Sequence, residues 1–176
     1  KAAAMTAVAE KPAQEEAALA ELQLGMSLQG RGALDDAAEV LRRADETARR
    51  WGDHARRGVV LCQLGLIALE KEDVEEARRL FIRAISSSRI GGDRAGQGAA
   101  RGFLALTLHL EGELERARSG YREALRDLEA GGDRRYGALF HSCLGAAEAE
   151  LGNVEEARIL VDLAHLRLPD ADPTLR

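Results

Sequence analysis

Pairs of adjacent carboxylates recur along the chain of 176 residues, at Asp35–Asp36, Glu75–Glu76 and Glu155–Glu156. Two carboxylates held together could bind a metal ion, or act as the acid and the base of a hydrolase. The pairs return at multiples of 40 residues, however, and each follows a turn. Acidic residues in the first turn of a helix offset the partial positive charge of its N-terminus. We therefore interpret the pairs as structural.

The remaining reactive residue types form no catalytic or metal-binding pattern. Histidine occurs at His54, His109, His141 and His165. None of them has metal-ligand spacing to another His, Cys or acid on one helix face, so no metal and no cofactor is expected. Gly96, Gly98 and Gly102 resemble a phosphate loop, but no strand precedes them and no Lys-Ser or Lys-Thr follows. The sequence predicts a protein that is not an enzyme.

The two cysteines, Cys62 and Cys143, stand in helical segments two repeats apart. In a regular helical array this separation is too large for a disulfide. We expect two buried or half-buried thiols, which favours a reducing compartment and a cytoplasmic location.

The composition excludes two classes of partner. Twenty-five basic and 30 acidic residues are interleaved and give a net charge of −5, whereas nucleic-acid-binding modules carry a basic patch or stripe. No apolar run is long enough to cross a membrane. Alanine, leucine, glutamate and arginine dominate the chain, and all four favour helices. We therefore predict an all-α protein without a nucleic-acid or membrane partner.

The elements that position these residues repeat every 40 positions. The recurring columns are Leu24, Leu64, Leu104 and Leu144; Ala37, Ala77, Ala117 and Ala157; and Ala44, Ala84, Ala124 and Ala164. Such a period is typical of stacked repeats. Each unit divides into two helices, predicted at His54–Lys71 and Val74–Ile90 in the second unit and at Arg94–Glu111 and Leu114–Ala130 in the third. The connections are short, so each unit is expected to be an antiparallel hairpin.

Turn residues mark the joints between the units, at Gly52-Asp53, Gly92-Asp93 and Gly132-Asp133. We expect each glycine to close a helix in the left-handed conformation and each aspartate to cap the next helix.

Leu64-Gly65, Val74, Ala77, Phe81 and Ala84 follow a spacing that resembles the tetratricopeptide repeat, and the pattern covers about residues 14 to 168. The resemblance implies a right-handed superhelical solenoid of helix hairpins, with repeats at 13–52, 53–92, 93–132 and 133–168. Residues 1–12 would be the tail of a preceding repeat or a leader helix, and residues 169–176 a C-terminal tail. Because the chain starts within a repeat and lacks an initiator Met, we expect it to be part of a longer protein.

Three departures set this chain apart from the usual repeat. Its unit exceeds the usual length of about 34 residues. The Gly-Asp joint replaces the closing proline. The bulky aromatic residue of the first helix is replaced by Leu28, Ala68, Leu108 and Glu148. This long variant resembles the arrays of bacterial signal-transducing ATPases and transcription activators, and the extended repeats of some eukaryotic scaffold adaptors.

The resemblance also implies a concave groove lined by the first helices. The residues carried onto it are Leu22, Met26, Cys62, Leu66, Leu69, Gly102, Phe103, Leu106, His109, Ser142, Cys143 and Ala146. An apolar groove of this kind would bind a peptide or a partner helix of another protein, or be covered by neighbouring repeats or by a second copy of the chain. Self-association through the array ends is also open. The alternative function is an effector-sensing domain of a transcription regulator, with a small-molecule pocket near Gly102.

Overall fold

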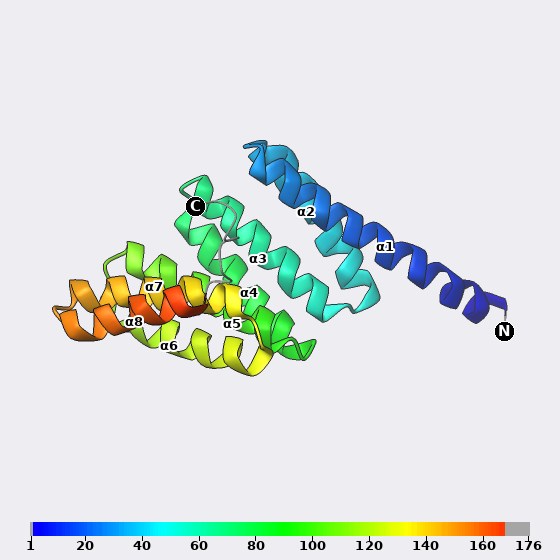
Figure 1. The fold of residues 1–176 in the computed structure, drawn as a ribbon. Helices are drawn as coiled ribbons and strands as arrows, with labels where there is room; N and C mark the ends of the chain where they lie inside the picture. Colours follow the sequence, from blue (N-terminus) through cyan, green and yellow to red (C-terminus); the bar gives the residue numbers. More distant parts are fainter. Residues whose placement is uncertain (1, 168–176) are drawn as a thin grey trace, which may run out of the picture. The chain divides into compact units, whose positions relative to one another are not determined.

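The structure, a computed structural model, describes the backbone of residues 2–167 and the side chains of residues 16–166. Its eight helices are shown in Figure 1. They are α1 (Ala2–Gly30), α2 (Leu34–Trp51), α3 (His54–Glu70), α4 (Val74–Ile90), α5 (Arg94–Leu110), α6 (Leu114–Gly131), α7 (Arg134–Glu150) and α8 (Val154–Arg167). The described backbone contains no strand, which confirms the all-α prediction. The helix ends predicted for the second and third repeats are correct to within one residue.

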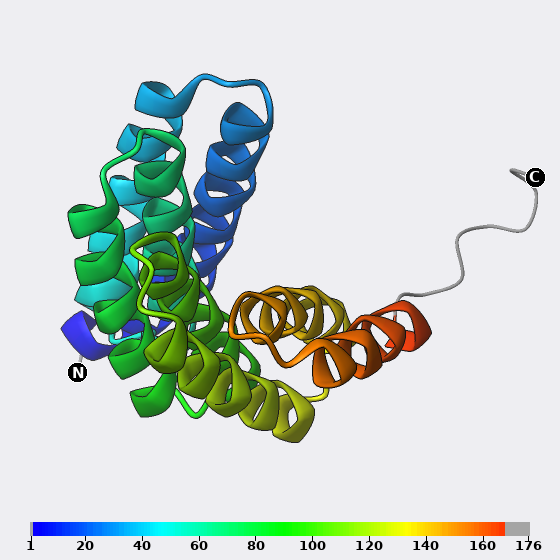
Figure 2. The ribbon, with the colours of Figure 1, turned by 90° about the vertical axis from the view of Figure 1, so that its left-hand side faces the viewer.

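The helices form two compact units, unit 1 over residues 1–92 and unit 2 over residues 93–176. In each unit two helix hairpins pack together (Figure 2). Unit 1 contains the hairpins α1–α2 and α3–α4, with α2 against α3. Unit 2 contains α5–α6 and α7–α8, with α6 against α7. Within each unit, the second helix of the first repeat therefore packs on the first helix of the next repeat.

Aspartate side chains cap four of the helices. Each accepts a hydrogen bond of 2.8–3.0 Å from the backbone N–H three residues on. The capping residues are Asp53, Asp73, Asp93 and Asp133. Three of these caps were predicted from the Gly-Asp joints and are confirmed, as is the left-handed conformation of the joint glycines. Asp73 is an additional cap that the sequence pattern did not indicate.

The turn inside each repeat also contains a left-handed residue. It is glycine in three repeats, with φ of 77° at Gly32, 78° at Gly112 and 86° at Gly152. The second repeat has Glu72 at this position, with φ of 62°. A side chain on a left-handed residue crowds the following carbonyl group, so Glu72 stores strain that the other repeats avoid.

The core of each hairpin depends on small residues where the helices approach. Ala37, Ala77 and Ala117 are fully buried. A Cβ atom added to Gly65 would lie 2.5 Å from the ring of Phe81. The predicted close contact between the two helices of a repeat is therefore present.

The third repeat forms the close contact between its two helices with different residues. It has Ala105 where the other repeats have glycine, and the facing position on α6 is Gly120. A Cβ atom added to Gly120 would lie 2.8 Å from the Cβ atom of Ala105. In this repeat the glycine at the contact therefore lies on the second helix, α6, and not on the first helix, α5.

The first helix begins before the first predicted repeat. Residues 2–12 are helical and continue without interruption into the first helix of the first repeat, so α1 does not end at Pro12. The predicted tail at 169–176 lies outside the described residues.

Candidate functional site

Unit 1 places its predicted groove residues at different depths. Leu22 and Cys62 are buried, Leu66 and Leu69 are half-buried, and Met26 is 45% exposed. Burial raises the pKa of the Cys62 thiol to about 12. Leu22 and Cys62 therefore belong to the core rather than to an open groove. Their position in the repeat predicts an open helix face, but neighbouring helices cover that face.

Unit 2 also buries two of its predicted groove residues, Gly102 and Phe103. The Phe103 ring packs edge-on against Phe140 at 5.2 Å and Tyr136 at 5.6 Å between centroids. A Cβ atom on Gly102 would overlap the Phe140 ring, so this glycine serves helix packing. The space expected to hold an effector near Gly102 is filled by that ring. Phe103 and Gly102, both predicted to line the groove, therefore belong to the core of unit 2.

The other unit 2 groove residues reach the surface at least in part. Leu106, His109 and Cys143 are half-buried and Ser142 is exposed.

Two of the predicted residues, His109 and Cys143, are linked through Tyr121. His109 Nε2 lies 3.0 Å from Glu150 Oε1, and His109 Nδ1 lies 3.3 Å from Tyr121 Oη. Because a carboxylate only accepts, Nε2 carries the proton, and in the neutral ring Nδ1 accepts from the Tyr121 hydroxyl. Cys143 hydrogen-bonds the same hydroxyl, and burial raises the pKa of its thiol. A thiol held protonated is a poor nucleophile, so this network ties α5, α6 and α7 together without activating Cys143.

The described residues offer no metal centre, since no group of three or more His, Cys, Asp or Glu side chains is placed to hold an ion. Among the helices that the structure describes, none is both long and apolar enough to span a bilayer.

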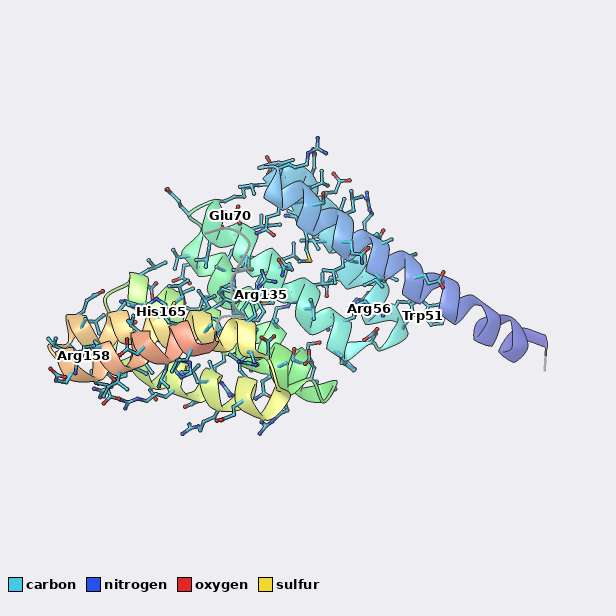
Figure 3. All side chains as sticks on the ribbon, viewed as in Figure 1. Trp51, Arg56, Glu70, Arg135, Arg158 and His165 are labelled. Atoms are coloured by element: carbon cyan, nitrogen blue, oxygen red, sulfur yellow. The ribbon has the colours of Figure 1, made fainter. Side chains whose placement is uncertain are left out.

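A hollow of about 390 Å³ lies along α7, and we call it the α7 hollow. It is lined by Arg135, Tyr136, Ala138, Leu139 and Ser142. Leu139 is 42% exposed, and the Arg135 guanidinium, labelled in Figure 3, lies 5.9 Å from the centre of the Tyr136 ring. Arg135 forms no ion pair with a described residue. Of this set the sequence analysis indicated only Ser142. The spacing of positions 135, 138, 139 and 142 on one helix face is a signal that could have identified the others.

Unit 1 contains a smaller pocket of about 260 Å³ between α2, α3 and the start of α4, the Ala68 pocket. Its floor is apolar and consists of Leu64, Ile67, Ala68 and Leu80, all buried. Its rim carries three cations and three anions. The cations are Arg42, Lys71 and Arg83, and the anions are Asp45, Asp73 and Glu76.

Unit 2 has a hollow of about 580 Å³ beside Glu148. The Glu148 side chain is 1% exposed. Its carboxylate accepts hydrogen bonds of 2.7 Å from Arg122 Nη2 and 2.7 Å from Asn153 Nδ2, and Arg118 Nη1 lies 3.8 Å away. A buried carboxylate is tolerated only when it is paired in this way. Glu148 occupies the position at which the usual repeat has a bulky aromatic residue. In this chain it is the centre of an ion-pair cluster.

Residues 16–89 match the family model described as tetratricopeptide repeat. None of the curated proteins matches the chain. Among solved structures, BtubC (BKLC) from P. vanneervenii shares the fold with a TM-score of 0.72 at 18% identity, over 88% of this chain and 64% of that chain. The chain thus spans 64% of the length of BtubC.

Two structures of MamA share the fold as well. One has a TM-score of 0.61 at 19% identity, over 85% of this chain and 77% of that one. The other has a TM-score of 0.60 at 19% identity, over 89% and 75%. Residues 16–89 thus match the tetratricopeptide repeat family, and the chain shares its helical-hairpin fold with these solved structures.

Proposed function

We propose that this chain is a protein-interaction module of a larger bacterial regulatory protein. It binds a peptide or a helix of a partner protein on the first helices of its repeats. The observation that carries the proposal is the α7 hollow, where an exposed apolar side chain lies beside an aromatic ring and an unpaired cation.

The chemistry of this hollow is that of a recognition surface. Leu139 and Ala138 supply apolar contact, Tyr136 adds a rigid aromatic wall, and Ser142 offers a hydroxyl group. Aromatic residues and arginine are enriched among the residues that contribute most to binding at protein interfaces. Because positions 135, 139 and 142 share one face, an extended peptide or a partner helix could contact all three along α7.

A binding experiment tests this surface with defined probes. Peptides selected from a randomised display library against the purified chain are labelled, and their affinity is measured by fluorescence anisotropy. Leu139→Glu removes the apolar contact and places a carboxylate beside Arg135, so we expect a loss of about tenfold or more, equivalent to one contact of about 1.4 kcal/mol.

The matched control is Ile82→Glu on α4, where the isoleucine is 52% exposed and lies outside the hollow. It should leave the affinity unchanged. If the surface extends along the other first helices, the double variant Leu66→Glu with Leu106→Glu also loses affinity. Selected peptides that bind the Leu139→Glu variant as tightly as the parent would refute the α7 surface.

A second candidate, self-association, is favoured by apolar side chains on the last described helix. Ile159 and Leu166 on α8 are 54% and 75% exposed, and Arg158 and His165 on the same helix are labelled in Figure 3. Sedimentation velocity over a range of concentrations would detect such an assembly. A single monomeric species at every concentration would eliminate this candidate.

A further inference from the structure

The Ala68 pocket of unit 1 and the Glu148 hollow of unit 2 occupy the same place in the repeat. Positions 42, 68, 73 and 76 of unit 1 correspond, two repeats on, to positions 122, 148, 153 and 156 of unit 2. Both sites are lined by the same arginine, Arg42 in one and Arg122 in the other, and by the same glutamate, Glu76 or Glu156. The floor differs, because Ala68 stands where unit 2 has Glu148.

In unit 2 the chain supplies its own carboxylate to this site. Glu148 rises from α7 and is held by Arg122 and Asn153 at 2.7 Å each. The arginine therefore has a counter-ion, and the side chain that provides it is almost fully buried.

In unit 1 the side chain at the same position ends at the Cβ atom of Ala68, so α3 supplies no carboxylate to the arginine. Arg42 lines the pocket and makes no direct hydrogen bond or ion pair with a described residue; its charge helps to lower the pKa of Asp35, but that carboxylate is bound by Lys71 at 2.6 Å. The corresponding arginine of unit 2, Arg122, is neutralised by Glu148.

The acidic residues of the rim are already engaged and do not replace that counter-ion. Asp45 accepts from Arg57 at 2.8 Å and lies 3.4 Å from Arg83. Asp73 caps α4. Glu76 accepts from Arg79 at 2.8 Å.

We propose that the Ala68 pocket binds a glutamate side chain of a partner peptide, with its carboxylate at Arg42 and its methylene groups against Ile67, Ala68 and Leu80. The bound side chain takes the place that Glu148 fills in unit 2. The proposal rests on the proposed function, since it assigns one contact of the peptide-binding module, but it concerns a surface separate from the α7 hollow. A charge-assisted hydrogen bond to a guanidinium in a partly buried pocket distinguishes glutamate from glutamine.

The probe is N-acetyl-glutamate N-methylamide, titrated into the full chain while the Arg42 Nε–Hε signal is followed by NMR. The expected result is a saturable shift of that signal, which the glutamine analogue produces at least about tenfold more weakly. Equal responses to the two compounds, or no saturable shift, would overturn the proposal.

Two substitutions exchange the properties of the units. Ala68→Glu supplies the internal carboxylate and should abolish probe binding, while Arg43→Ala, on an exposed arginine next in the chain, should leave it intact. If Ala68→Glu fails to fold, Arg42→Gln tests the same contact. Calorimetry should then show that the Arg42→Gln variant no longer binds the probe. Conversely, Glu148→Ala empties the unit 2 site and should raise the number of bound probe molecules from one to two per chain. Retained binding in Ala68→Glu, or an unchanged number in Glu148→Ala, would refute the assignment.

The two proposals fail separately. Leu139→Glu should leave the response of Arg42 to the probe unchanged, because the α7 hollow is in the other unit. A null result at Arg42 would leave the selected peptides and their dependence on Leu139 untouched.

Discussion

Adding one methyl group to Gly65 on α3 is expected to destabilise unit 1. The Cβ atom of Gly65→Ala would lie 2.5, 2.8 and 2.9 Å from three ring carbons of Phe81. Phe81 is fully buried, so its ring has no free volume into which to withdraw. Overpacking of this kind costs about 1–3 kcal/mol. The better helix propensity of alanine returns about 1 kcal/mol, which leaves a net loss of about 1 kcal/mol.

The matched control is Gly145→Ala, at the same place in the fourth repeat. The nearest atoms to its Cβ would be Ala157 O at 3.2 Å and Val161 Cγ2 at 3.3 Å. Val161 is 39% exposed, so its side chain can shift outward. The overpacking cost is then small, and the gain in helix propensity makes the variant as stable as the parent or more stable, by up to about 1 kcal/mol.

Urea unfolding measures both variants. Far-ultraviolet circular dichroism follows the whole chain, and the fluorescence of Trp51, the one tryptophan, reports on unit 1. The midpoint for Gly65→Ala should fall in both signals. If Gly65→Ala proved as stable as the parent, or Gly145→Ala the more damaging of the two, the close-contact argument would be refuted.

Three further predictions concern the turns, the caps and the thiols. Glu72→Gly should raise the free energy of unfolding by up to about 1 kcal/mol by relieving the left-handed glutamate, whereas Gly112→Glu should lower it; thermal melts of the two variants compare them directly. Asp93→Ala removes the bond to the Gly96 N–H and should cost about 0.5–2 kcal/mol in urea unfolding, and a loss below that range would show that the cap contributes little. Cys62, with its pKa raised to about 12, should react with iodoacetamide at pH 8 about a thousandfold more slowly than an ordinary thiol, as measured by mass spectrometry. Because the thiol loses its proton more readily in the unfolded chain, its contribution to stability is complete below about pH 8.5 and is lost as the pH rises toward 12.

The helices and their caps could be predicted because their causes are local. The alanine columns place the helices, and the Gly-Asp joints end one helix and begin the next within a few residues. Asp73 caps α4 in the same way, but the residue before it is Glu72 rather than glycine. The joint signature therefore missed it, although aspartate before an acidic first turn was a usable signal.

The candidate sites could be predicted only in part, because a repeat position gives the face of a helix and not what covers that face. Phe103 sits at a groove position, yet Phe140 and Tyr136 from α7 bury it. Glu148 stands at a position that departs from the repeat pattern, and its partners Arg118 and Arg122 belong to another helix. No rule based on one repeat brings these residues together.

The contact between Ala105 and Gly120 limits how such repeats can be recombined. An α5 helix moved into another repeat would bring the methyl group of Ala105 against a leucine or a valine in place of Gly120. The reverse transfer, of a glycine-bearing helix onto α6, would leave a void of about one methyl group, at a cost of about 1 kcal/mol. Chimaeras of this array should therefore be cut in the Gly-Asp joints, so that each hairpin moves as a whole and both sides of the contact travel together.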